Sequence, residues 1–152
     1  TYWMDPEVRT GRGISFATQE DWVKQELISG VQRAAVDATG IGRDMAKRPM
    51  MGAIAERMAD RVILTSDNPR HEKPQVILSQ ILRGFSLGEA AHVEPDRARA
   101  IAWAIQAAAP TDVVLIAGKG HEQYQEMEGH RLVFSDVAHA QAALVQREAI
   151  AC

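Results

Sequence analysis

Two short runs of apolar residues constrain the fold of this chain most strongly. Residues 61–65 read Arg-Val-Ile-Leu-Thr, and residues 112–116 read Asp-Val-Val-Leu-Ile. The second run is apolar after its first position, which is the pattern of a strand buried on both faces of a parallel sheet. Each run is too short for a helix, and turn residues follow it. The chain is therefore expected to contain a sheet that is covered on both sides.

Helical patterns separate these strands. Prolines at first helical positions and serine or aspartate caps mark where the helices begin. Strands that alternate with helices of this length are typical of βαβ units. We therefore predict an α/β fold, a mainly parallel sheet flanked by helices. The expected helices span residues 49–60, 74–84, 96–109 and 136–148, and further short strands span residues 91–94 and 132–134.

The first 38 residues fit this alternation poorly. Apolar positions recur at helical spacing over residues 18–35, so a helix is predicted there, and no clear strand precedes it. We treat residues 1–38 as an atypical N-terminal segment and residues 39–152 as one domain. Apolar residues at helical spacing elsewhere are expected in the core, including Trp103 and the group Met50, Met51 and Met58.

The composition excludes several classes of protein. The 152 residues carry 17 basic and 20 acidic side chains, a formal charge of −3, so no basic surface for a nucleic acid is expected. No apolar run approaches the roughly 18 residues that cross a bilayer, so no membrane association is predicted. The single cysteine, Cys152, excludes disulfides and cysteine metal sites within the chain, and no metal site is predicted. These features predict a cytoplasmic protein.

Two loops are the expected positions for chemistry, because ligands of open parallel sheets bind beyond the carboxyl ends of the strands. The first loop, residues 66–70, follows the strand at 61–65. The second loop, residues 118–122, follows the strand at 112–116. If the two strands are neighbours, the loops face each other across a crevice.

The first loop combines a carboxylate, an amide and a guanidinium. Arg70 can hold a carboxylate through two parallel hydrogen bonds, and Asp67 can accept from an ammonium group. With Asn68 beside them, these groups suit the zwitterionic head of an α-amino acid. The alternative is an ordinary turn, in which Asp67 or Asn68 bonds its own backbone and Arg70 is solvated.

The second loop places Gly118 and Gly120 around Lys119, before His121 and Glu122. Its glycines allow the backbone to approach a ligand closely. Glu122 could accept from an ammonium group, and Lys119 could bind an anion. The alternative is a glycine-relieved turn with surface charges. The basic stretch at residues 43–48, before a helix start, is a third candidate for anion binding, or else a solvated loop.

Three motifs in order resemble the Mur ligase family. They are Lys47-Arg48-Pro49 with Met51-Gly52-Ala53-Ile54-Ala55, Thr65-Ser66-Asp67-Asn68-Pro69-Arg70, and Ala117-Gly118-Lys119-Gly120-His121-Glu122. The resemblance covers roughly residues 40 to 146 and is to the C-terminal domain. The Asp-Asn-Pro-Arg motif is typical of the members that add meso-diaminopimelate to UDP-MurNAc-L-Ala-D-Glu. The resemblance implies a Rossmann-like domain that binds the incoming amino acid during peptidoglycan synthesis.

The resemblance also implies roles for residues of both loops. Asn68 and Arg70, with Asp67 beside them, would hold the distal head group of diaminopimelate. Gly118 and Glu122 would complete the pocket, and Arg43 resembles the family arginine that joins them. No catalytic residue is assigned to this chain.

The family reaction implies partners and cofactors beyond these residues. The complete ligase uses ATP and Mg²⁺, forms an acyl phosphate, and has central and N-terminal domains. This chain contains no phosphate-loop sequence, so it is expected to bind neither cofactor alone and not to catalyse ligation alone. One alternative is a non-catalytic binding domain with residues 1–38 as a homodimer-forming element. Another is a related ligase that adds a different amino acid, against which Arg70 argues.

Overall fold

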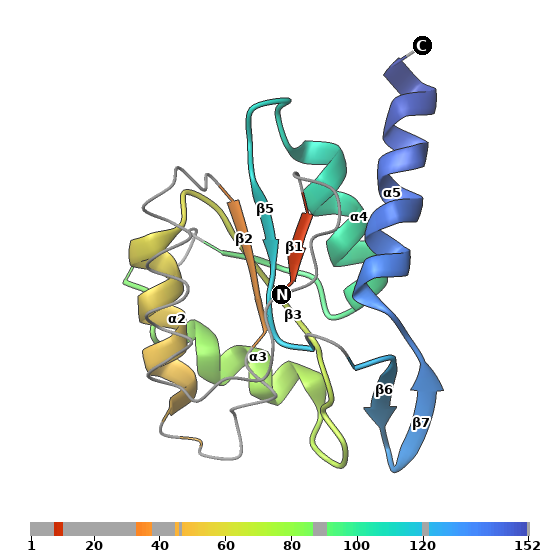
Figure 1. Cartoon of the computed structure of the whole chain (residues 1–152). Coiled ribbons are helices and arrows are strands. Elements are labelled where there is room, and N and C mark those ends of the chain that lie inside the picture. Colours follow the sequence, from red (N-terminus) through yellow and green to blue (C-terminus); the bar gives the residue numbers. More distant parts are fainter. Residues whose placement is uncertain are drawn as a thin grey trace.

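The computed structural model describes residues 8–10, 33–37, 45, 47–86, 91–119 and 122–151. In this part of the chain, five parallel strands form one sheet in the order β1-β5-β2-β3-β4 (Figure 1). The predicted α/β class with a parallel sheet is confirmed. The strands are β1 (Val8–Thr10), β2 (Arg33–Asp37), β3 (Val62–Thr65), β4 (Ala91–Val93) and β5 (Val114–Ile116).

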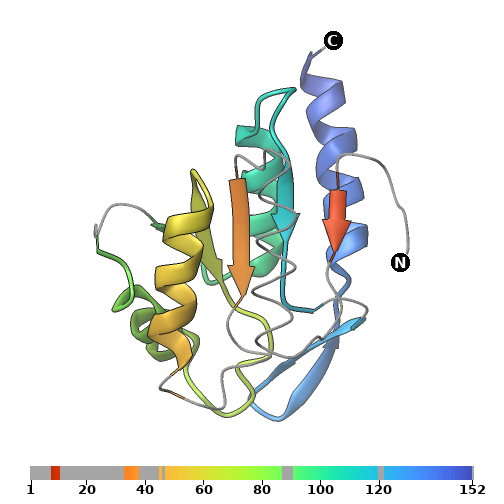
Figure 2. The ribbon, with the colours of Figure 1, turned by 60° about the vertical axis from the view of Figure 1, so that its left-hand side comes forward.

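Helices cover both faces of this sheet. One pair packs on one side and the other pair on the opposite side, as Figure 2 shows. All four were predicted, with ends that differ by a few residues. The first pair is α2 (Lys47–Met58) with α3 (Pro74–Leu82), and the second is α4 (Arg97–Ala107) with α5 (Asp136–Ala151).

Strand β3 divides the core into two clusters. Its side chains alternate between faces, so Val62 and Leu64 pack with α2 and α3, whereas Ile63 packs with α4 and α5. Leu64 is completely buried. This double burial explains why the strand contains no charged residue after Arg61.

A hairpin lies at the edge of the sheet where β3 and β5 end (Figure 1). Its antiparallel strands are β6 (Tyr124–Met127) and β7 (His130–Val133). The two turn residues, Glu128 and Gly129, have φ angles of 52° and 79°, as a tight hairpin turn requires. A strand was predicted at residues 132–134, but β6 was not, because Tyr-Gln-Glu-Met lacks an apolar run.

The structure contradicts the end of the helix predicted over residues 18–35 and the burial predicted for Trp103, and the two strands that precede the loops are not neighbours. The helix predicted over residues 18–35 cannot extend to its end, because β2 begins at Arg33; residues 18–32 lie outside the described residues. Strands β3 and β5 are not neighbours, since β2 lies between them. Trp103 is 39% exposed and stacks on His92, with 4.5 Å between ring centroids, because Ile101 and Ile105 occupy the inward face of α4.

The methionines of α2 divide between core and surface. Met51 packs in the α2–α3 cluster, but Met50 is exposed, so its predicted burial is wrong. Among the described residues, no helix has the length and apolar character needed to cross a membrane. The division of the chain at residue 39 stays a prediction, as does a dimer-forming role for the segment before it.

Candidate functional site

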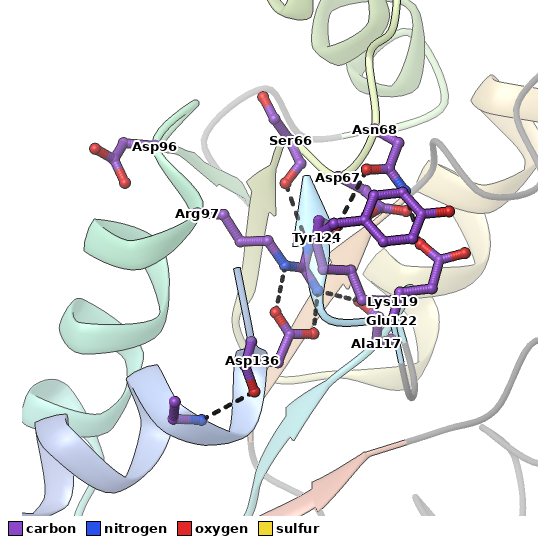
Figure 3. Close-up of polar contacts among 12 residues, drawn as sticks. Ser66, Asp67, Asn68, Asp96, Arg97, Ala117, Lys119, Glu122, Tyr124 and Asp136 are labelled. Carbon is purple, nitrogen blue, oxygen red and sulfur yellow. Dashed lines mark hydrogen bonds and ion pairs between the residues drawn. The ribbon is translucent and has the colours of Figure 1, made fainter. Parts of the chain in front are cut away.

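The first and second loops meet at the carboxyl edge of the sheet, although their strands are not adjacent. The Asn68 amide nitrogen donates a hydrogen bond to Glu122 Oε2 at 2.7 Å (Figure 3). Asn68 is partly buried and comes from the loop after β3, and Glu122 comes from the loop after β5. Two residues predicted from separate motifs are therefore brought together.

The Asn68 amide has a defined orientation. Its oxygen accepts hydrogen bonds from the Glu126 backbone N–H at 2.8 Å and from Lys119 Nζ at 3.1 Å. Both partners are donors, so the NH2 group must face the Glu122 carboxylate. Asn68 thereby connects the first loop to the second loop and to β6.

Asp67 and Lys119 form a buried ion pair. Lys119 Nζ lies 2.7 Å from Asp67 Oδ1, and their side chains are 0% and 2% exposed respectively. The ammonium group that pairs with Asp67 in this structure is therefore that of Lys119. In the same way, the anion predicted for Lys119 is a carboxylate of the chain itself, so the prediction that Lys119 binds an external anion finds no support.

Arg70 lies at the rim of the site beside the hairpin. Its backbone N–H donates to Glu126 O at 3.0 Å, and its backbone carbonyl accepts from the Glu128 N–H. These contacts hold Arg70 at a φ of 56°, which a long side chain rarely adopts. The guanidinium is half-exposed and lies 3.9 Å from the Glu126 carboxylate, so a ligand can reach it.

Of the two remaining predicted site residues, Gly118 and Arg43, the structure describes only Gly118. Gly118 has a φ of 114°, a conformation that favours glycine, and so it redirects the chain as it leaves β5. Arg43 lies outside the described residues, as do Gly120 and His121.

Arg97, a buried arginine that was not predicted from the sequence, connects the starts of the two loops. Arg97 donates to both carboxylate oxygens of Asp136 at 2.7 Å, and each side chain is 1% exposed. It also donates to the backbone carbonyls of Ser66, at 3.4 Å, and Ala117, at 2.9 Å (Figure 3). These carbonyls lie directly after β3 and β5, so Arg97 fixes where both loops begin.

One signal in the sequence pointed to Arg97. Cations are unfavourable in the first turn of a helix, where the backbone N–H groups carry partial positive charge. Arg97 occupies the first position of α4, directly after the cap Asp96. A basic residue at such a position indicates a partner elsewhere, which here is Asp136 at the start of α5.

A second buried arginine ties α2 to the segment after the first loop. Arg48 Nη1 and Nη2 donate to the two carboxylate oxygens of Glu72 at 2.9 and 2.8 Å, and Nη1 also donates to Gln80. Arg48 is 2% exposed. Glu72 is exposed, but both of its carboxylate oxygens are paired with Arg48.

Acidification is expected to weaken the fold through this pair. The hydrogen bonds from Arg48 hold the pKa of Glu72 below its ordinary value of 4.5. A carboxyl group with a lowered folded-state pKa stabilises the fold above the unfolded pKa and loses that contribution as the pH falls through the folded pKa. The urea midpoint of Glu72→Gln should therefore change less than that of the unmodified chain between about pH 6 and pH 3. Glu148→Gln, at an exposed helical position, is the control and should match the unmodified chain.

The charges exposed at this site suit a zwitterion. Glu122 offers a carboxylate to an ammonium group, and Arg70 offers a planar guanidinium to a carboxylate. Asn68 precedes Arg70 by two positions in the first loop and touches Glu122 of the second loop directly. Within the residues that the structure describes, no three histidine, cysteine or acidic side chains are grouped as a metal site.

Comparison with known proteins gives consistent similarities. A model of the family "Mur ligase, glutamate ligase domain" matches residues 25–120. The UDP-N-acetylmuramoyl-L-alanyl-D-glutamate--2,6-diaminopimelate ligase of Acidovorax sp. (strain JS42) is 59% identical over 112 residues, which are 74% of this chain and 22% of that protein. The ligase of the same name from Xanthomonas campestris pv. campestris (strain 8004) is 48% identical over 139 residues, 88% of this chain and 28% of that protein.

A solved structure shares the fold. The structure of a UDP-N-acetylmuramoyl-L-alanyl-D-glutamate--2,6-diaminopimelate ligase superposes with a TM-score of 0.81 and 34% identity. It covers 96% of this chain, which in turn covers 31% of that one. The chain thus spans less than a third of the length of these relatives.

Proposed function

Because the chain belongs to the Mur ligase family and corresponds to its C-terminal domain, we propose that it binds the incoming amino acid of the ligation, meso-diaminopimelate. The contact between Asn68 and Glu122 carries this proposal. This contact joins the first loop and the second loop, so that together they form one wall of the proposed pocket. Relatives named as 2,6-diaminopimelate ligases support the same substrate.

Each pocket residue has a proposed role that follows from its chemistry. Arg70 donates two parallel hydrogen bonds to the distal carboxylate of diaminopimelate. The Glu122 carboxylate accepts hydrogen bonds from the distal ammonium group of diaminopimelate. The Asn68 amide holds the Glu122 carboxylate in place. Gly118 lets the backbone approach the ligand, and Arg43 is proposed as a further contact. Asp67 acts inside the wall, through its pair with Lys119.

These roles explain discrimination against lysine. Lysine lacks the second carboxylate of diaminopimelate, so its binding leaves the guanidinium of Arg70 without a partner. A site built for a charged group rejects a ligand that lacks it, because desolvated groups of the protein are left unpaired. We propose that, in the complete ligase, ATP, Mg²⁺ and the other substrate bind to the central and N-terminal domains. We also propose a cytoplasmic location, because ATP is supplied in the cytoplasm.

Calorimetry on this chain tests the proposal. We expect meso-diaminopimelate to bind and L-lysine to bind more weakly. Arg70→Ala should reduce the affinity for diaminopimelate by about tenfold to a hundredfold, the effect of losing hydrogen bonds between charged groups. Arg83→Ala, which removes an exposed arginine after α3, is the matched control and should bind like the unmodified chain. Equal affinities for the Arg70 variant and the control would refute the site.

A further inference from the structure

Lys119 stands in the middle of the glycine-rich second loop, yet it points inward. Its side chain is completely buried, and the rings of Tyr124 and Phe134 lie 5.9 Å from its ammonium nitrogen. A buried ammonium group is costly unless it is paired and hydrogen-bonded. The surroundings of Lys119 therefore have to supply those partners.

Lys119 combines one ion pair with two hydrogen bonds. An ammonium group has three N–H donors and no acceptor. Lys119 Nζ contacts Asp67 Oδ1 at 2.7 Å, Asn68 Oδ1 at 3.1 Å and the Tyr124 backbone carbonyl. An ion pair and two hydrogen bonds therefore hold this ammonium group against acceptors of the protein itself.

These acceptors belong to different segments. Asp67 and Asn68 lie in the loop after β3, and Tyr124 begins β6, whereas Lys119 itself follows β5. One nitrogen atom therefore joins two strand ends and the hairpin. Figure 3 shows Lys119, Asn68 and Glu122 together at this junction.

We propose that Lys119 is the positioning residue of the amino-acid pocket. It holds the Asn68 amide so that the NH2 group restrains the Glu122 carboxylate, and it acts on the ligand only through these two residues. This inference rests on the proposed function and goes further, because it assigns the lysine of the Gly-Lys-Gly-His-Glu motif a role inside the protein. The Glu126 N–H shares the amide oxygen, so loss of Lys119 loosens Asn68 without releasing it.

The test removes the ion pair as a unit. Lys119→Met alone would leave Asp67 as an unpaired buried charge and could unfold the chain. The combined variant Asp67→Ala/Lys119→Met removes both charges and keeps the interior apolar. Arg83→Met, at an exposed position, is the control for loss of a cation.

The first readout needs no ligand. The side-chain amide signals of Asn68 in a ¹H–¹⁵N NMR spectrum are assigned by their disappearance in Asn68→Ala. We expect two well-separated, slowly exchanging signals in the unmodified chain. In Asp67→Ala/Lys119→Met, hydrogen exchange at this amide should be at least about tenfold faster, as expected for the loss of one charge-assisted bond. Unchanged signals and exchange rates in the combined variant would overturn the proposal.

The second readout is the affinity for meso-diaminopimelate in a mutant cycle. The combined variant should bind about tenfold more weakly than the unmodified chain. In an Asn68→Ala background, the same two substitutions should change affinity by less than about twofold, because their effect passes through Asn68. An equal loss in both backgrounds would overturn the proposal. If the unmodified chain binds no diaminopimelate, the proposed function fails and the NMR readout alone decides the role of Lys119.

Discussion

Replacing Asp136 with alanine is expected to lower the free energy of unfolding by about 3–5 kcal/mol. The substitution leaves the Arg97 guanidinium in the interior without its carboxylate. Both side chains are 1% exposed, and Arg97 donates to both oxygens of Asp136 at 2.7 Å. An uncompensated charge at this depth costs far more than a surface ion pair contributes. Urea unfolding followed by circular dichroism measures the change.

A paired substitution separates the cost of the stranded charge from the value of the contact. Arg97→Met/Asp136→Leu removes both charges and should retain most of the stability that Asp136→Ala loses, because apolar groups of similar volume often replace a buried ion pair without penalty. Equal destabilisation by the two variants would contradict this account. The paired variant also removes the donors to the carbonyls of Ser66 and Ala117, so we expect its affinity for diaminopimelate to fall although it stays folded.

Gly84→Ala is expected to destabilise the fold by about 3 kcal/mol or more, the upper end for overpacking. A Cβ atom at this position would lie 1.7 Å from the backbone carbonyl oxygen of Pro49. Neither partner can move alone, because Pro49 belongs to the first turn of α2 and Gly84 follows Arg83, the C-cap of α3. The two helices would have to separate and expose the apolar cluster between them. Thermal and urea unfolding measure the loss.

Gly129→Ala is the matched control for adding a methyl group. Its nearest neighbour, His71 Cε1, would be at an ordinary 3.5 Å, but Gly129 has a φ of 79°. The expected cost is the backbone strain alone, about 1–2 kcal/mol. If Gly84→Ala costs no more than Gly129→Ala, the close approach of α2 and α3 does not limit packing at this position.

The parts of the fold that were predicted from the sequence are those with strong local patterns. Strands β3 and β5 are apolar because both of their faces are buried, and Pro74 marks the start of α3. The same rule that places ligands beyond parallel strands pointed to both loops before their contact was known. That contact, from Asn68 to Glu122, spans 54 positions in the chain.

The parts that were not predicted depend on tertiary contacts. Strand β6 contains polar residues, and its pairing with β7 is stabilised by the turn at Glu128 and Gly129 rather than by an apolar pattern. Helical spacing alone does not say which face of α4 carries the core, so Trp103 was assigned to the wrong side. Periodicity also extended a helix into β2, whose alanines and valine suit either structure.

For the charged side chains of the site too, the residue types could be predicted from the sequence but their tertiary contacts could not. The residue types in both loops indicated paired opposite charges, but not which charges pair within the protein. Asp67 and Lys119 neutralise each other in the interior, which leaves Arg70 and Glu122 nearer the surface. No spacing in the sequence distinguishes an inward lysine from one that faces solvent.

The backbone bridge between Arg70 and β6 has a mechanical consequence. Two main-chain hydrogen bonds join Arg70 to Glu126 and Glu128 on either side of Met127. The hairpin and the tip of the first loop must therefore shift together when an amino acid enters or leaves. Lengthening the turn of the hairpin, which lies outside the three motifs, would shift the backbone of Arg70 and so change the position of its guanidinium group. Selectivity could then be altered without replacing any residue that contacts the ligand.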